Sequence, residues 1–386
     1  MRIALVTETF PPFNGGSSRR YFEVFRRLVK KGHEVDVFTV RLNESWSKFE
    51  EIDGLRVFRT DMVLRNFITS DGFRSISQVL LYTSWAWKRL GNERYDIIEA
   101  NHCPIFPTFS SWYHSRVNHI PLSVTFHEVW FDHWYHYVPS SIYAPLGMIM
   151  EKAMSRLPSL YIAVSRFTAD KLEKLLHIDN RKIVIIPNGV NLDMFNGVDV
   201  KKDRNKIIYF GRLNPHKRVD LLLEAMKIVI EDYPDVKLEI VGDGPMRRFY
   251  EEYTLKNGLK DHVSYIGNVS DLELVIKLKS SYIYVLPSIR EGQSITTLEA
   301  MAAGTPQVVV MSDDSGASQL LHESKSGIIV RASALSIAEG IKMLLDDRNS
   351  WLKFRDNGLK YVKNYTWDFA AEEYNRAYTS LVNYMA

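Results

Sequence analysis

The chain has 386 residues, of which 46% are hydrophobic and 25% charged, with a formal net charge of +3. This length favours two domains, and so small a charge does not indicate a nucleic-acid-binding protein. The one cysteine, Cys103, excludes an intramolecular disulfide framework and is typical of a reducing compartment. The sequence shows neither a signal-peptide pattern nor about 20 consecutive apolar residues, so we expect a cytoplasmic protein without a membrane span.

The first half of the chain alternates predicted strands with predicted helices. The strands are expected at residues 3–7, 34–40, 97–100, 122–126 and 160–164, and one helix at 76–90. A stiff turn with the permissive glycines Gly15 and Gly16 joins the first strand to a helix that Gly32 ends. This alternation favours a parallel sheet with helices on both faces.

The second half repeats this pattern from about residue 188. Strands are expected at 206–210, 237–241, 263–266, 282–286 and 307–310, with a helix at 220–233. The pattern predicts an α/β fold of two Rossmann-like domains in tandem, with residues 186–190 as the hinge. Ligands bind such sheets at the carboxyl ends of the strands, so we expect the two domains to face each other across a cleft.

The segment 290–306 carries the most specific signal. Glu291 lies in a loop before a helix that Ser294 is expected to cap and that Gly304 ends. The free N–H groups of a helix N-terminus attract anions, and Glu299 lies further along the same helix. Two carboxylates beside an anion site suit a nucleotide sugar, because its diphosphate needs donors and its hydroxyls need acceptors.

The spacing Glu-x7-Glu followed by Ala-Met-Ala-x-Gly-x-Pro resembles the donor-site motif of retaining glycosyltransferases of the two-Rossmann GT-B fold, family 4 in particular. The loop at 209–217 is similar to the family's Gly-Arg…Lys-Gly element, in which the cations Arg212 and Lys217 would hold the donor diphosphate. Arg218 replaces the glycine that usually follows the lysine. The Gly15–Gly16 turn resembles the glycine loop of the family's first domain.

The resemblance implies a metal-independent, retaining transfer of a hexosyl group from a nucleotide-diphosphate sugar to a hydroxyl acceptor on a glycan, lipid or small molecule. The matching histidine of the family contacts the sugar, so the strand-end His127 is expected there, with a protonation state that changes near neutral pH. The predicted catalytic residues are His127, Glu291, Arg212 and Lys217, and the predicted donor-binding residues are Gly15, Gly16, Arg212, Lys217, Gly292, Gln293, Ser294, Ile295 and Glu299. Gln293-Ser294 stands where the family usually has a Phe-Gly-like pair.

The expected domains are 1–187 on the acceptor side and 188–366 for the donor, with a helix at 367–386 that the resemblance brings back to the first domain. Residues 1–187 hold 24 Lys/Arg and 19 Asp/Glu, a balance of +5, and the remainder holds 25 and 27, a balance of −2. The basic first half and the aromatic segment 130–137 are compatible with peripheral contact at the inner face of a membrane, and with a lipid-linked acceptor.

Neither a cofactor nor a metal is expected, because Arg, Lys and a helix N-terminus can balance the phosphate charge. His133 and His136 lack a recognised zinc-ligand pattern. The sequence leaves open a nucleotide-sugar epimerase or phosphorylase on the same architecture, and a non-catalytic nucleotide-sugar-binding protein. A dinucleotide-dependent redox enzyme is disfavoured because neither half has a complete Gly-x-Gly-x-x-Gly. The donor's base and sugar, the acceptor and the oligomeric state are not indicated.

Overall fold

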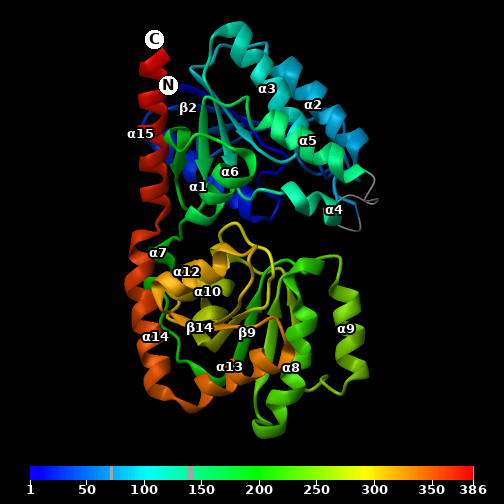
Figure 1. Ribbon diagram of the computed structural model, residues 1–386, viewed down its shortest axis with the longest axis vertical. Coiled ribbons are helices and arrows are strands. Elements are labelled where there is room, and N and C mark those ends of the chain that lie inside the picture. Colours follow the sequence, from blue (N-terminus) through cyan, green and yellow to red (C-terminus); the bar gives the residue numbers. More distant parts are fainter. Residues whose placement is uncertain (70–72, 138–142, 386) are drawn as a thin grey trace. The chain divides into compact units, whose positions relative to one another are not determined.

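The computed structural model describes residues 1–69, 73–137 and 143–385 (Figure 1). The chain divides into two compact units. Unit 1 consists of Met1–Asn188 together with Trp367–Ala386, and unit 2 consists of Gly189–Thr366. Each unit has a sheet of its own, with eight strands in unit 1 and six in unit 2. The fold class is therefore α/β with two Rossmann-like units, as the sequence predicts.

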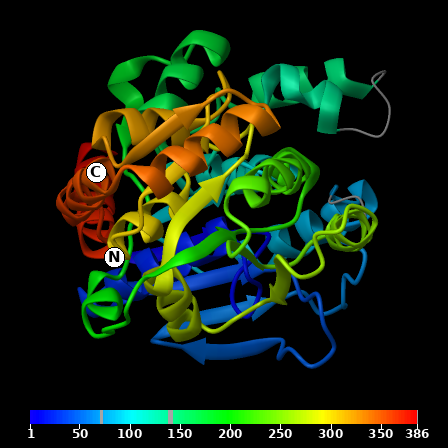
Figure 2. The same ribbon diagram turned by 90° about the horizontal axis from the view of Figure 1, so that it is seen from below.

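The sheet of unit 1 has the strand order β3-β4-β2-β1-β5-β6-β7-β8. Its strands are β1 (Arg2–Val6), β2 (Glu34–Thr39), β3 (Phe49–Ile52), β4 (Leu55–Arg59), β5 (Ile97–Asn101), β6 (Leu122–Phe126), β7 (Leu160–Ala163) and β8 (Ile183–Ile185). Neighbouring strands are parallel except for β3, which pairs antiparallel with β4 at the border of the sheet (blue in Figure 2). The parallel strands place their carboxyl ends along one edge.

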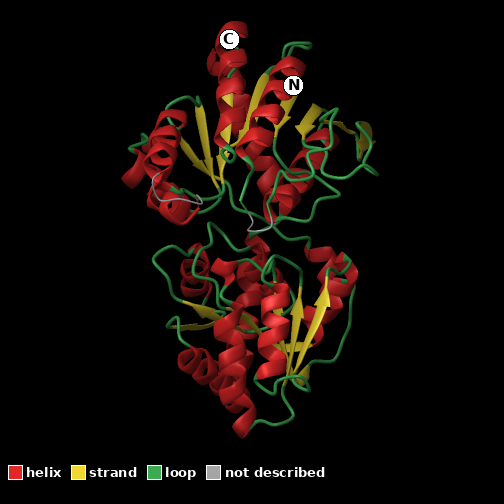
Figure 3. Cartoon of the chain, turned by 90° about the vertical axis from the view of Figure 1, so that its right-hand side faces the viewer, coloured by secondary structure: helices red, strands yellow, loops and turns green. Residues whose placement is uncertain are grey.

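Helices cover the sheet of unit 1 (Figure 3). They are α1 (Gly16–Lys30), α2 (Ile76–Leu90), α3 (Ile105–Asn118), α4 (Trp134–Tyr137), α5 (Ala144–Met154), α6 (Arg166–Leu176) and α15 (Trp367–Met385). In α1 the apolar residues Tyr21, Val24, Phe25 and Leu28 recur at helical spacing and are fully buried. The helix ends before Gly32, whose φ of +88° lies in the left-handed region that favours glycine.

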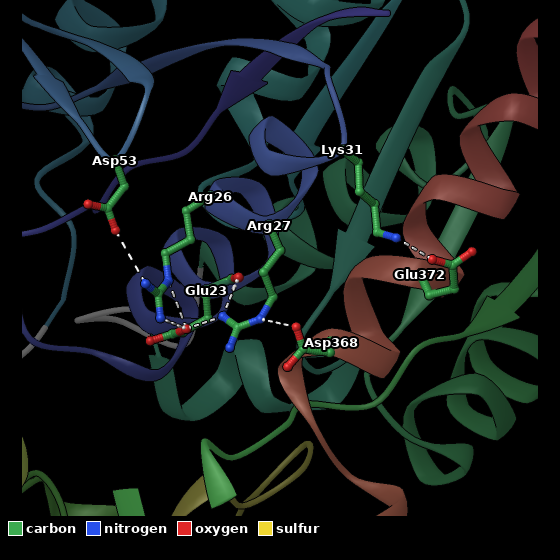
Figure 4. Close-up of polar contacts among 7 residues, drawn as sticks. All are labelled: Glu23, Arg26, Arg27, Lys31, Asp53, Asp368 and Glu372. Atoms are coloured by element: carbon green, nitrogen blue, oxygen red, sulfur yellow. Dashed lines mark hydrogen bonds and ion pairs between the residues drawn. The ribbon is translucent and has the colours of Figure 1, made fainter. Parts of the chain in front are cut away.

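The last helix, α15, packs beside α1 in unit 1 (Figure 1). Two ion pairs join the helices at their surface, Arg27–Asp368 at 2.9 Å and Lys31–Glu372 at 2.5 Å (Figure 4). Glu23 orders this face of α1 by pairing with Arg27 from four residues earlier. Exposed pairs of this kind contribute little stability each, so the buried side of α15 matters more.

That buried side carries a polar network. Tyr374 of α15 lies 2.7 Å from the Thr125 hydroxyl, and Tyr378 donates to Glu99 at 2.8 Å. Thr125 also donates to Glu99 at 2.6 Å. Arg20 is fully buried and donates to the Tyr374 hydroxyl at 3.3 Å. The hydroxyls of α15 thus satisfy buried charged groups of the rest of unit 1, which would be costly to leave unpaired.

The sheet of unit 2 has the order β11-β10-β9-β12-β13-β14, and all of its strand pairs are parallel. Its strands are β9 (Asp203–Phe210), β10 (Lys237–Val241), β11 (Val263–Gly267), β12 (Ser281–Leu286), β13 (Gln307–Val310) and β14 (Gly327–Val330). Its helices are α7 (Leu192–Asn196), α8 (Val219–Asp232), α9 (Arg247–Lys256), α10 (Asp271–Ser280), α11 (Ile295–Ala302), α12 (Gly316–Ser324), α13 (Ala334–Asp346) and α14 (Arg348–Tyr361). In α8 the predicted apolar stripe of Leu222, Ala225, Met226 and Val229 is fully buried.

The strands expected from apolar runs are confirmed, with ends that shift by three residues at most. Strands β3, β4, β8 and β14 are additions. Strands β3 and β4 mix charged with apolar residues, β8 is only three residues long, and β14 begins with a glycine. Among the residues that the structure describes, no helix combines the length and apolar character that a membrane span requires.

Candidate active site

The strand order of unit 2 reverses between β9 and β12. From β9 the chain continues outward to β10 and β11, and from β12 it continues the other way to β13 and β14. The loops that leave the carboxyl ends of β9 and β12 therefore diverge. Such a reversal point is where open parallel sheets bind their ligands. The two loops carry the predicted site residues Arg212 and Lys217 on one side and Glu291 on the other.

An ion pair joins these two loops. Lys217 Nζ lies 2.5 Å from Glu291 Oε1, and the two side chains are only 18% and 11% exposed. The backbones are joined as well, because the N–H of Ile289 donates to the carbonyl of His216 at 3.1 Å. Two residues that lie 74 positions apart in the sequence are thus adjacent at the reversal point.

Three cations surround the half-buried His216. Burial lowers the pKa of His216 well below its usual value, and the charges of Lys217, Arg290 and Arg212 lower it further. The imidazole is consequently neutral at pH 7. Arg290 was not predicted as a site residue, although its place directly before Glu291 was a usable signal. The cluster suits a doubly charged phosphate group.

The motif helix α11 begins beside this cluster. The Ser294 hydroxyl accepts a hydrogen bond from the N–H of Thr297 at 3.2 Å, which confirms the predicted cap. The same hydroxyl lies 2.9 Å from that of Thr296, which accepts from Tyr284 at 2.6 Å. Gly292, Gln293 and Ile295 are half-buried around the start of the helix.

Glu299 lies in the second turn of α11 and is 3% exposed. Burial raises the pKa of Tyr284 well above its usual value, and the charges of Glu291 and Glu299 add to that shift. Both carboxylates therefore act on one phenol of β12. The structure brings the predicted residues of unit 2 together at the carboxyl ends of β9 and β12.

A close backbone contact holds the Glu291 loop in place. The N–H of Glu291 donates to Asp314 at 3.1 Å, and the N–H of Gly316 donates to the carbonyl of Glu291 at 2.7 Å. A Cβ at Gly316 would lie 2.3 Å from the carbonyl oxygen of Gly292. Only glycine allows this approach, and the approach fixes the direction in which Glu291 leaves the sheet.

Arg218 is a strained position beside the site. It stands where the family usually has glycine, and its backbone is left-handed with φ 49° and ψ 42°. Its guanidinium donates to Asp220 at 2.8 Å, and this contact offsets part of the conformational cost. The expected glycine thus corresponds to a turn whose conformation this chain keeps with a larger side chain.

In unit 1 the backbone of the glycine loop differs from the expected one. Gly15 precedes α1 with an extended backbone, φ −171°, which any residue adopts. The expectation that it supplies unusual backbone freedom is therefore wrong for Gly15. What requires glycine is space, since a Cβ would lie 3.0 Å from the Phe13 ring. Gly16 is the exposed first residue of α1.

His127 follows β6 at the carboxyl edge of the unit 1 sheet. Its ring meets that of Tyr21 edge-on, with centroids 5.6 Å apart. Burial, with further contributions from Arg20 and His102, lowers the pKa of His127 well below its usual value. The ring is therefore neutral near pH 7, and the expectation that it titrates there is wrong.

His102, which was not predicted, lies one residue beyond β5, and its centroid is 6.4 Å from that of His127. Burial is the main cause that lowers the pKa of His102 to about 4. Its position at a strand end resembled that of His127 and could have indicated it. Two neutral imidazoles thus lie at this edge of unit 1.

The aromatic segment 130–137 mainly supports its own loop. Trp130 is 5% exposed and packs against Trp134, with ring centroids 5.2 Å apart. The buried carboxylate of Glu151 accepts from the N–H of Trp130 at 2.9 Å and from the Trp134 indole at 2.9 Å. The side chains of Asp132, His136 and Tyr137 lie outside the described part. Among the described side chains, no group of three or more His, Cys, Asp or Glu is arranged to hold a metal ion.

Comparison with known proteins assigns both units. Residues 14–194 match the model of Glycosyltransferase Family 4, and residues 192–361 match that of Glycosyl transferases group 1. The chain belongs to glycosyltransferase family 4. It is a glycosyltransferase that uses a nucleotide-sugar donor, and the site residues of unit 2 lie within the second match.

Three relatives illustrate the assignment. The glycosyltransferase is 28% identical to an uncharacterized glycosyltransferase of Methanocaldococcus jannaschii, over 97% of this chain and 96% of that one. It is 28% identical to the UDP-Gal:alpha-D-GlcNAc-diphosphoundecaprenol alpha-1,3-galactosyltransferase of Escherichia coli, over 77% and 76%. Its fold resembles that of sucrose-phosphate synthase from Thermosynechococcus elongatus, with a TM-score of 0.84, 20% identity and 99% of each chain covered.

Arg218→Gly should be more stable than Arg218→Ala by about 1 kcal/mol, because only glycine adopts the left-handed conformation without cost. Both variants lose the contact with Asp220, so the difference between them isolates the backbone. Urea unfolding of the two proteins measures it. If the alanine variant is the more stable one, the left-handed backbone does not strain this position.

Proposed function

We propose that the chain transfers a hexosyl group, with retention of anomeric configuration and without a metal ion, to a hydroxyl group of an acceptor. The observation that carries this is the Lys217–Glu291 pair at the β9/β12 reversal point, next to Arg212 and the N-terminus of α11. A donor needs cations for its diphosphate and carboxylates for its hydroxyls, and this arrangement offers both within one unit.

The diphosphate is assigned to Arg212, Lys217 and the start of α11. As the bond between the sugar's anomeric carbon and the diphosphate oxygen breaks, negative charge grows on the leaving group. Fixed cations in a half-buried site stabilise that charge more in the transition state than in the ground state. Because the cluster includes three cations around His216, it supplies the charge that a metal would otherwise contribute.

Glu291 is assigned to the sugar hydroxyls. Its Oε1 pairs with Lys217, which holds the carboxylate in one orientation, while Oε2 can accept from a hydroxyl. Glu299, further along α11, is assigned to the ribose. Gly292, Gln293, Ser294 and Ile295 would line the start of α11 around the diphosphate and the sugar. In unit 1, Gly15, Gly16 and the neutral His127 are proposed to contact the sugar.

The acceptor is proposed to be a hydroxyl that a lipid-linked molecule carries. The Escherichia coli relative is named for a diphosphoundecaprenol acceptor and an alpha-1,3 linkage, which supports both a lipid carrier and an α product. An activity assay distinguishes this proposal from the three alternatives that the sequence left open. An epimerase would act on the donor without an acceptor, a phosphorylase would need phosphate, and a binding protein would not turn over.

A surface of unit 1 supports membrane contact. Helices α2, α3 and α5 are neighbours and expose large apolar side chains. These are Ile76, Leu80 and Trp87 on α2, Tyr113 and Val117 on α3, and Leu146 and Ile149 on α5, each at least 45% exposed. The same helices expose Lys88 and Arg116, and their one acidic residue, Glu151, is buried. We name these three helices the apolar-basic face and propose that it docks peripherally on anionic lipid.

Glu291→Gln should retain nucleoside diphosphate binding while turnover falls by about 10²–10³, because a neutral amide orients the sugar hydroxyls poorly. Calorimetry and a transfer assay on the same preparation separate the two effects. Glu252→Gln, which alters an exposed carboxylate of unit 2, is the matched control. Turnover close to that of the parent would remove Glu291 from the reaction.

Arg212→Ala and Lys217→Ala should each weaken nucleoside diphosphate binding by roughly tenfold to a hundredfold, since a charge-assisted hydrogen bond contributes about 1.5–3 kcal/mol. Binding of the bare nucleoside should be unchanged, and a chelator should leave the activity of the parent unchanged. Calorimetry with both ligands tests this, with the exposed Arg248→Ala as control. Equal losses for the two ligands, or a parent silenced by chelator, would contradict the phosphate assignment.

The parent should sediment with vesicles that contain anionic phosphatidylglycerol, and less so in high salt, which screens the basic residues. The double variant Leu146→Ser/Ile149→Ser should reduce this binding severalfold. Leu272→Ser, a similarly exposed leucine in unit 2, is the matched control. If vesicle binding changes neither with salt nor with the α5 substitutions, the apolar-basic face is not the membrane-docking surface.

A further inference from the structure

A hollow of about 280 Å³ lies at the carboxyl edge of the unit 1 sheet. It is lined by the turn after β1, the loop after β2 and strand β3, through Pro11, Pro12, Ser45, Trp46, Ser47, Glu50 and Ile52. Its volume is slightly below the range of pockets for drug-sized ligands and suits a single small ring. The turn after β1 that lines the hollow continues to Gly15 and Gly16.

Arg59 fixes the segments that line this hollow. It is fully buried, and it donates to the carbonyl of Pro11 at 2.7 Å and to that of Ser47 at 3.0 Å. It also pairs with Glu50 at 2.5 Å, and its guanidinium carbon lies 5.7 Å from the centre of the Trp46 ring. One side chain thus connects all three walls. Such anchoring prepares the hollow for a ligand before the ligand arrives.

A second arginine, Arg41, fixes the loop after β2 that carries Trp46. Arg41 donates to the carbonyl of Trp46 at 2.7 Å and to that of Glu44 at 2.8 Å. Trp46 itself is half-buried and remains available at the hollow. A tryptophan on a braced surface loop is a site for flat apolar contact, because its large ring loses little freedom on binding.

The lining chemistry favours a neutral polyol ring. Trp46, Pro11, Pro12 and Ile52 offer apolar surface for the C–H face of a ring. The Glu50 carboxylate and the serine hydroxyls offer hydrogen-bond acceptors for its hydroxyl groups. The described residues that line the hollow include one acid, Glu50, which pairs with Arg59, and no lysine or arginine. The lining therefore favours a neutral ring over a phosphate group.

We propose that this hollow binds the hydroxyl-bearing six-membered ring of the acceptor, either a hexopyranose or a cyclitol. This rests on the proposed function and names the acceptor's chemical class and its subsite. Trp46 stacks on the ring, and Glu50 accepts from its hydroxyls. The turn from Pro11 to Gly16 then joins the acceptor subsite to the proposed sugar contact within unit 1.

Binding of the ring is measured without a donor, so that it stands apart from transfer. The full chain is titrated with methyl α-D-mannopyranoside and, separately, with myo-inositol while tryptophan fluorescence is followed. At least one of the two should give a saturable change that distinguishes the hexopyranose from the cyclitol. The change should be lost in Trp46→Ala and weakened about tenfold in Glu50→Gln. Glu51→Gln, its exposed neighbour, should match the parent.

A second variant covers the case in which Trp46→Ala or Glu50→Gln fails to fold. Ser47→Phe fills the hollow but keeps the backbone carbonyl that Arg59 uses, so it should block the ring without loss of thermal stability. All variants should bind nucleoside diphosphate as the parent does. The acceptor KM of Trp46→Ala, Glu50→Gln and Ser47→Phe should rise about tenfold or more, and that of Glu51→Gln should match the parent.

Three results would overturn the assignment. One is a parent that binds neither probe saturably. Another is ring binding that survives both Trp46→Ala and Ser47→Phe. The third is tighter binding of mannose 6-phosphate than of the uncharged glycoside. A parent that binds the ring but transfers no sugar would instead count against the proposed function and leave the subsite in place.

Discussion

The reversal of strand order between β9 and β12 is the constraint on which the donor site depends. Parallel strands deliver every following loop to one edge, and in the described sheet of unit 2 it is at this point that two neighbouring loops diverge and leave room for a ligand. The Lys217–Glu291 pair then spans the gap with opposite charges. Such a pair costs desolvation energy when it is half-buried, so it needs well-defined geometry to be favourable. A backbone hydrogen bond between the two loops helps to provide that geometry.

Unit 1 handles its buried charge differently. Arg20 and Glu99 are both fully buried, and their partners are tyrosine and threonine hydroxyls, an asparagine and a backbone carbonyl. Hydroxyls can either donate or accept, so one network serves a cation and a carboxylate at once. Two of these hydroxyls come from Tyr374 and Tyr378, and the last helix is therefore part of the interior of unit 1.

Much of the fold could be predicted from periodicity alone, because buried parallel strands are short apolar runs and their helices carry clear stripes. The edge strand β3 and its neighbour β4 could not, since Phe49-Glu-Glu-Ile is half charged and becomes a strand only by pairing with β4. The site residues of unit 2 could be predicted from the sequence because the motif and the strand order agree. Arg290 and His102 had only the signal of their positions, one directly before Glu291 and one at a strand end. The hollow at Trp46 had none, since it depends on which loops the fold brings together.

Local backbone conformation was the least predictable feature. Gly15 is extended, while Arg218 occupies a left-handed conformation that composition would assign to glycine. A side chain lies close in both cases: the Phe13 ring leaves little room for a Cβ at Gly15, and the Asp220 carboxylate accepts a hydrogen bond from Arg218. Both contacts join residues only two positions apart, but neither residue pair predicts its backbone conformation when the sequence is read residue by residue.

Because α15 belongs to unit 1, the two units complete their folds at different times during synthesis on the ribosome. Unit 2 is inserted between two segments of unit 1, and its ends meet where the N–H of Val190 donates to the carbonyl of Tyr365 at 2.9 Å. Unit 2 is complete once Thr366 has emerged. Unit 1, although translated first, must wait for the last helix before Arg20 and Glu99 have all of their partners. The first half of this chain to be made is thus the last to mature, and a nascent chain that stops short of Trp367 leaves charged groups without their hydroxyls in the interior of unit 1.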